Sequence, residues 1–203
     1  MENTLNEKES LRIINEMIAQ AKNNFQKGAG DSGIFCGCFV ALIALLNFGL
    51  IYWLDNPNTS FHIWWLMIPM MFISKYLKKR NEKESFVKTH IDKIVSAVWI
   101  AFPISIAVLL LLIFGLSIVF KTSYFSAMIT PGILILMGMA QYVTGRAIRL
   151  KLYIYGSVVF WIGALVCVGV YACGNIPAQF LVLAVCCLFG LVVPSYQLNK
   201  LAK

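Results

Sequence analysis

Six long apolar runs are the feature that most limits what this chain can fold into. They occupy residues 33–54, 61–77, 94–120, 126–144, 152–173 and 178–196. Their interiors contain no Asp, Glu, Lys or Arg except Lys75, whose long side chain can extend its amine to a membrane interface. Most of the runs are long enough for a hydrocarbon core about 30 Å thick. We therefore predict an all-α polytopic membrane protein with six transmembrane helices.

Composition agrees with this fold and argues against one class of partner. Of the 203 residues, 60% are hydrophobic and 13% are charged, which differs strongly from an average soluble domain. The net charge of +8 would suit nucleic acid, but the charges lie in the segments that connect the apolar runs. Such a distribution is typical of membrane proteins with basic cytoplasmic loops. We therefore expect no nucleic-acid partner.

The basic residues also predict how the chain is threaded through the membrane. Seven Lys and Arg residues fall within residues 75–93, between the second and third runs. Short basic loops resist translocation, so this segment is expected in the cytoplasm. Placing it there puts sixteen of the 17 Lys and Arg residues on the cytoplasmic side and leaves only Lys121 outside. We predict a multi-pass protein of the bacterial inner (cytoplasmic) membrane with both termini in the cytoplasm.

Residues 1–32 form a separate polar segment before the membrane domain of residues 33–203. Apolar residues recur in it at steps of three and four, which is the spacing of one helix face; they are Leu11, Ile14, Ile18, Ala21 and Phe25. We predict a cytoplasmic amphipathic helix over residues 5–27, followed by a Gly-rich hinge. Its apolar face could dock on the inner leaflet or on protein at the cytoplasmic ends of the spans. Docking on protein is favoured, because the helix is nearly neutral and lipid-surface helices are usually basic.

Two amide side chains, Asn47 and Gln141, are the candidate polar residues inside the membrane. An amide in hydrocarbon needs a hydrogen-bond partner, which a neighbouring helix or a bound solute can supply. The two residues are therefore compatible with a pore or substrate site, and equally with bonding between helices. Ion-coupled carriers usually place ionisable groups at this depth, and no Asp, Glu, Lys or Arg lies in the middle of a run.

No catalytic, metal or cofactor site is expected. Cys36 and Cys38 would lie on nearly opposite faces of a helix, Cys186 and Cys187 diverge in the same way, and no CxxC motif occurs. Buried cysteine is usually a small hydrophobic residue. An intramembrane protease or hydrolase needs paired acids, a Ser/His set or a metal motif such as HExxH, and the apolar runs contain no such set. We therefore predict that the chain is not an enzyme and binds no cofactor.

A weak repetition raises an alternative for the architecture. Each even-numbered run ends with a hydroxyl residue just before a basic stretch; these residues are Ser74, Thr144 and Ser195. The six spans could thus be three repeated helical hairpins in series. Every multi-span protein alternates spans and loops, however, so the pattern does not require a true repeat.

Four stretches of the sequence resemble a known family. They are LRIINEMIAQAKNNF near the N-terminus, IWWLMIPMMFI in the second run, VWIAFPISI in the third and VVPSYQLNKLA at the C-terminus. Through them the chain resembles a family of short, uncharacterised bacterial six-span inner-membrane proteins. That family offers no established activity and no catalytic residues. Its members are often encoded beside a small winged-helix regulator, which implies a membrane partner in a regulatory pair.

These observations lead to two expectations about function. The first is a regulatory or scaffold protein that acts through its cytoplasmic helix and basic loop. The alternative is a small-solute or lipid-interacting transporter or channel. In both cases the expected partners are the lipid bilayer and either a cytoplasmic protein or further copies of the chain in a homo-oligomer.

Overall fold

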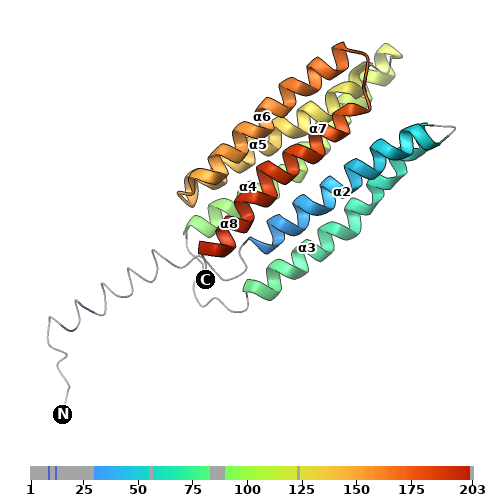
Figure 1. The fold of residues 1–203 in the computed structure, drawn as a ribbon. Coiled ribbons are helices and arrows are strands. Elements are labelled where there is room, and N and C mark those ends of the chain that lie inside the picture. The colour runs from blue at the N-terminus through green and yellow to red at the C-terminus, as the bar shows by residue number, and fades with distance from the viewer. Residues whose placement is uncertain are drawn as a thin grey trace.

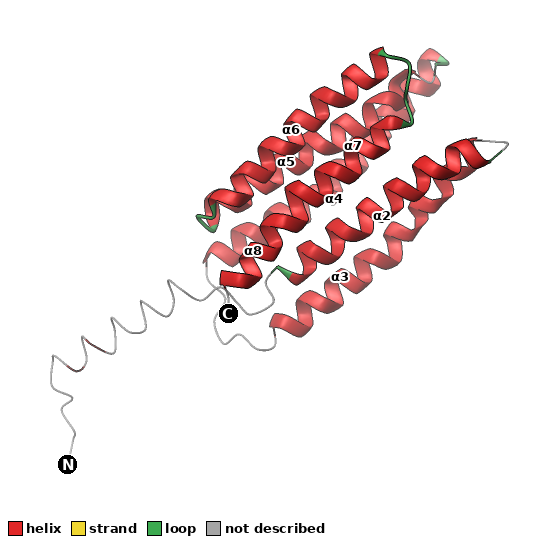
Figure 2. Cartoon of the chain, viewed as in Figure 1, coloured by secondary structure: helices red, strands yellow, loops and turns green. Residues whose placement is uncertain are grey.

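The computed structural model describes residues 9, 12, 30–54, 57–82, 90–122 and 124–201. The regular structure of these residues is helical, and no strand occurs among them (Figure 2). The elements are α2 (Asp31–Trp53), η1 (Pro57–Leu66), α3 (Met67–Glu82), α4 (His90–Phe120), η2 (Tyr124–Met128), α5 (Ile129–Ala147), α6 (Lys151–Ala172), α7 (Ala178–Cys187), η3 (Leu188–Val192) and α8 (Val193–Leu201). The predicted all-α fold is confirmed.

Two kinds of helix interrupt the α-helical pattern. The 3₁₀ helices η1 and η2 lead directly into α3 and α5, while η3 is a π-helical turn that joins α7 to α8. The segment from α7 to α8 is therefore one continuous helical rod with a π turn inside it. Pro194 explains why the hydrogen bonding changes from α-helical to π-helical at this point.

Five helical stretches are long and apolar enough to cross a membrane. They are Asp31–Trp53, Lys93–Phe120, Tyr124–Ala147, Lys151–Ala172 and Ala178–Leu201. Each coincides with one of the apolar runs in the sequence. The remaining run corresponds to a shorter apolar helix, Thr59–Ser74. The described part of the chain is therefore a helical bundle with five helices of membrane-spanning length and one shorter apolar helix.

The helices lie side by side along a roughly common direction (Figure 1). The rod formed by α7, η3 and α8 contacts α2 and also α6, and α6 packs closely along α5. The buried core lies between these elements and includes Phe160, Leu134 and Leu191. In contrast, α3 packs mainly against α2, and α4 packs mainly against α5. These two helices are therefore peripheral, and the central rod positions the other elements.

The start of α2 is held by the end of α8. The Gly30 N–H donates to Asn199 Oδ1 at 2.8 Å, and Asn199 Nδ2 donates to Asp31 Oδ1 at 2.5 Å. A helix N-terminus has free N–H groups and favours negative charge, and Asn199 and Asp31 meet these needs. The helix accordingly begins at Asp31, inside the segment predicted as a hinge and two residues before the predicted run.

Apart from Glu9 and Arg12, which are helical, the predicted amphipathic helix of residues 5–27 falls outside the described residues. Its apolar face, formed by Leu11, Ile14, Ile18, Ala21 and Phe25, belongs to that part of the chain. Residues 83–89 of the basic loop do so as well. The docking of this helix on protein therefore stays a prediction.

Candidate functional site

Asn47 lies on α2 and is completely buried. In the amide orientation that satisfies both polar atoms, its nitrogen donates to Ser60 Oγ at 2.9 Å and to the Ser60 carbonyl at 3.1 Å. Its oxygen accepts from the indole N–H of Trp64 at 2.9 Å. Both polar atoms thus have partners within the chain, and the side chain ties α2 to η1. This geometry favours bonding between helices over the lining of a pore.

Gln141 lies on α5, is also completely buried, and has a different environment. Its Nε2 donates to the backbone carbonyl of Gly190 at 3.0 Å. Its Oε1 has no hydrogen-bond partner among the residues that the structure describes. An unpaired buried acceptor costs free energy, roughly 1–3 kcal/mol, so such a group is an exception that calls for an explanation.

The acceptor for Gln141 is available because of a proline. In an α-helix the Gly190 carbonyl would accept from the N–H of residue 194, but Pro194 has no N–H. The backbone adopts the π-helical turn of η3 at this point, and Gln141 supplies a donor from the neighbouring helix. Proline, π turn and amide therefore form one coupled arrangement. Single π turns inside α-helices are frequent at functional sites.

Close backbone packing surrounds the same carbonyl. A Cβ added to Gly156 of α6 would lie 2.4 Å from the Gly190 oxygen, which is too close for any side chain. Phe160, one turn further along α6, covers the other side of Gly190. We refer to Gln141, Gly156, Gly190 and Pro194 as the π-turn crossing. Asn47 is not part of the π-turn crossing, because Asn47 forms hydrogen bonds with η1 whereas Gln141 forms one with η3.

Further buried polar contacts do not follow from the sequence candidates. Gln179 Nε2 donates to the Cys167 carbonyl at 3.2 Å, and the Tyr153 hydroxyl lies 3.2 Å from Ser195 Oγ. Gln179 stands second in its apolar run, where an amide is expected to face water, so the sequence offered no signal for its burial. Tyr153 is the third residue of α6, and nothing in the local sequence identifies Ser195 as its partner. Both contacts attach the α7–α8 rod to α6.

The three hydroxyl residues of the weak repeat have unlike partners. Ser74 lies 3.3 Å from Ser32 Oγ, Thr144 donates to the Ala140 carbonyl of its own helix, and Ser195 contacts Tyr153. Equivalent residues of three repeated hairpins would be expected to make equivalent contacts. The repetition therefore receives no support from these side chains.

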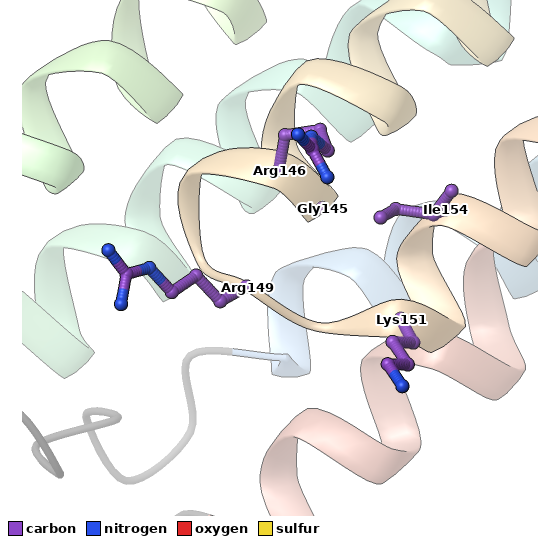
Figure 3. A pocket seen from close by; sticks show the side chains of 5 residues that line it. All are labelled: Gly145, Arg146, Arg149, Lys151 and Ile154. Carbon is purple, nitrogen blue, oxygen red and sulfur yellow. The ribbon is translucent and has the colours of Figure 1, made fainter.

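A pocket of about 350 Å³ lies at the turn between α5 and α6. Its lining residues are Gly145, Arg146, Arg149, Lys151 and Ile154. Figure 3 shows Ile154 pointing from α6 toward the end of α5, while Arg149 and Lys151 extend in other directions around the turn. The charged groups thus surround the pocket without converging on one point. We call this feature the basic pocket.

The turn at the basic pocket has an unusual backbone. Arg149 has a φ of 57°, in the left-handed region that normally suits glycine. The Leu150 N–H donates to the Gly145 carbonyl at 3.0 Å, which is the six-residue bond of a Schellman helix end. The comparable bond from Asn175 to Val170 encloses Gly174, the residue expected at such a position. In the sequence, Arg146, Arg149 and Lys151 indicate which side of the membrane the turn lies on. Their density within six residues is the signal that could have identified a site.

The cysteines give no indication of a metal centre among the described residues. All six are free, and no group of three or more His, Cys, Asp or Glu side chains in this part of the chain is arranged to hold a metal ion. Cys167, Cys186 and Cys187 are buried in the core, which agrees with their expected role as small hydrophobic residues.

Comparisons with known proteins add no identification. No protein-family model, curated protein or solved structure matches this chain. The resemblance to short bacterial six-span membrane proteins therefore stays a prediction. The π-turn crossing, the basic pocket and the distribution of charge are the features of the molecule that bear on its function.

Proposed function

We propose that the chain crosses the bacterial inner membrane six times, with both termini in the cytoplasm. Length supports the short second span: the apolar helix Thr59–Ser74 contains eight residues of η1 and eight of α3 and would rise about 28 Å, against a hydrocarbon core of about 30 Å. Charge supports the orientation, because five described cations belong to helix ends that are cytoplasmic in this arrangement; they are Lys93, Arg146, Arg149, Lys151 and Lys200. Lys121 belongs to the opposite end.

Single-cysteine labelling tests this topology. Asn175→Cys and Glu84→Cys are each made in a Cys173→Ser background, because Cys173 is an exposed native thiol near the first position. An impermeant maleimide added to intact cells should label Asn175→Cys and spare Glu84→Cys until the membrane is opened. The reverse pattern would contradict the orientation, and labelling of both from outside would contradict the number of spans.

We propose further that the protein is a regulatory or scaffold protein that acts at its cytoplasmic face. The supporting observation is the division of its polar groups. Asn47 bonds within the bundle, while the described cations other than Lys121 gather near the helix ends assigned to the cytoplasm. The groups able to meet a water-soluble partner are thus mostly on one side. The N-terminal helix and the basic loop of residues 75–93 would extend that surface.

Co-purification with matched variants tests this proposal. Ile14→Asp with Ile18→Asp places two charges on the apolar face of the predicted helix, and Asn15→Asp with Asn23→Asp places two on its polar face. After crosslinking in the source bacterium, a specific cytoplasmic protein should be recovered with the native chain and with the second variant. It should be lost from the first variant. Identical recovery from all three would contradict a role for this face.

A small-solute or lipid-interacting transporter is the second candidate, and the π-turn crossing favours it. The unpaired Oε1 of Gln141 and the π turn of η3 are features that a substrate or a moving helix could use. Native protein in liposomes should then release an entrapped solute faster than protein-free liposomes, and Gln141→Leu should slow that release. Equal release from the two proteins would remove Gln141 from the pathway.

A further inference from the structure

The basic pocket is lined by three cationic side chains, from Arg146, Arg149 and Lys151. These three side chains form no ion pair with a described residue, and all three are exposed. All three cations line the same pocket, so an anion in it would be attracted to each of them. The spread of the charged groups around the turn means that a ligand must offer several oxygens at once (Figure 3).

Backbone strain at Arg149 is a second, independent observation. The left-handed conformation at φ 57° costs free energy for any residue with a Cβ, and glycine would remove that cost. Strained residues of this kind concentrate at binding sites, because their position is held for a reason other than stability. Arginine at this position places its guanidinium beside the pocket, which a glycine cannot do.

The surface next to the pocket is apolar and has the length of a lipid chain. Ile154 lines the pocket itself. Tyr142 lies one helical turn before Arg146 on the same face of α5, and its ring contacts that of Trp161 with centroids 5.8 Å apart. Both rings are partly exposed, at 40% and 37%. Trp161 lies about 15 Å along α6 from Lys151, which is about half of a hydrocarbon core.

We propose that the basic pocket binds the phosphate headgroup of an anionic phospholipid. One acyl chain of this lipid lies along α5 and α6, over Tyr142 and Trp161. Arg146, Arg149 and Lys151 bind the phosphate and the neighbouring ester or glycerol oxygens. Basic pockets between membrane helices on the cytoplasmic side are suited to such headgroups. A soluble phosphate would use the same cations but would gain nothing from the aromatic surface, so the phospholipid is the favoured occupant.

Thermal unfolding of delipidated protein in detergent tests the proposal. Phosphatidylglycerol, phosphatidylcholine and inorganic phosphate are titrated separately, and the rise in melting temperature is recorded. Phosphatidylglycerol should give a saturable rise, whereas the other two should give little or none. The triple variant Arg146→Gln, Arg149→Gln, Lys151→Gln should weaken the phosphatidylglycerol affinity on the order of a hundredfold, since each cation near an anionic surface contributes roughly fivefold.

A matched control separates this site from general attraction to a basic protein. Lys93→Gln, Lys121→Gln and Lys200→Gln together remove the same charge from elsewhere and should leave the affinity nearly unchanged. Arg149→Gly should weaken binding, whereas Lys121→Gly, at a similarly strained turn, should not. Equal loss in the two triple variants, or no loss in either, would overturn the site. An equal response to inorganic phosphate would overturn the lipid and identify a soluble anion as the ligand.

Discussion

Helix α4 and the rod formed by α7, η3 and α8 are both apolar enough to cross a membrane, yet they face opposite environments. Only 6% of the most apolar stretch of α4 is buried inside the protein, compared with 56% for the rod. Large side chains such as Leu111 and Ile118 of α4 are exposed, whereas Leu191 of η3 is buried. An apolar run therefore identifies a span, but packing decides whether that span faces lipid or protein.

The same comparison shows where polar groups become important. Side chains from α5 and α6 bond the rod, including Gln141 to Gly190 and Tyr153 to Ser195. Between helices in a membrane, the hydrophobic effect adds little, and close packing with such hydrogen bonds holds the bundle together. We therefore expect substitutions in the rod and at its crossings to be costly, and matched substitutions in α4 to be nearly silent.

The largest expected difference lies between two leucines. Leu191→Ala leaves a cavity in the core between the rod and its neighbouring helices and should lower the free energy of unfolding by about 2–5 kcal/mol. Leu111→Ala, at a side chain that is 73% exposed, should change it by less than about 0.5 kcal/mol. Unfolding in detergent mixed with increasing dodecyl sulfate, followed by circular dichroism, measures both. Similar losses of unfolding free energy for the two variants would mean that α4 is buried against a second copy of the chain in an oligomer. The contrast between α4 and the rod would then hold only for a single copy.

Two glycines sharpen the comparison at the level of the backbone. Gly156→Ala would place a Cβ 2.4 Å from the Gly190 oxygen and should force α6 away from the rod, at a cost of about 1–3 kcal/mol. Gly115 of α4 has open space around its Cβ position, so Gly115→Ala should be neutral or stabilise the helix by up to about 1 kcal/mol. The same unfolding measurement distinguishes the signs. A destabilising Gly115→Ala would contradict the peripheral position of α4.

The sequence predicts the elements of this fold well, because a span needs only length and the absence of charge. The approximate positions of the apolar helices follow from that rule, although α2 begins at Asp31 rather than at residue 33 and α4 begins at His90 rather than at residue 94. Asn47 and Gln141, the two amides inside the runs, are both completely buried. The partners of these amides do not follow. Trp64 and Ser60 bond Asn47 through η1, and nothing in the local sequence of α2 identifies them. Interhelical contacts depend on the rotation and register of each helix, which the apolar pattern leaves open.

The basic pocket and the π-turn crossing were less accessible for two physical reasons. Pro194 indicates a disturbed helix, but the sequence does not show that the disturbance is a π turn or that Gln141 of another helix donates to the Gly190 carbonyl there. The pocket lies at the end of α5, where Arg149 rather than glycine has the left-handed conformation. Because arginine is rare in the left-handed conformation, its presence in the sequence does not indicate that the backbone adopts this conformation at position 149.

A double-mutant cycle tests the coupling at the π-turn crossing, where a smaller effect is expected. Gln141→Leu removes the donor to the Gly190 carbonyl and should cost about 1 kcal/mol in the native background. Pro194→Ala restores a backbone N–H that can bond the same carbonyl, so Gln141→Leu should cost less in that background. The expected coupling is roughly 0.5–1.5 kcal/mol, measured as the difference between the two costs. Additive costs would show that proline and amide act independently.

The smallest effect concerns the ends of α4 and α5, where the two regions behave alike. Lys121 follows α4 and has a φ of 50°. The Thr122 N–H donates to the Ser117 carbonyl and closes the turn around Lys121. The Leu150 N–H donates to the Gly145 carbonyl and closes the turn around Arg149 in the same way. Both turns place a residue with a Cβ where glycine is favoured, so Lys121→Gly and Arg149→Gly should each raise the free energy of unfolding by up to about 1 kcal/mol without lipid. When phosphatidylglycerol is present, the stability gained by Arg149→Gly should shrink or reverse, because this variant loses a side chain that binds the headgroup. The stability gained by Lys121→Gly should persist. If both gains persist, the strain at Arg149 is only a feature of the turn and has no connection with lipid.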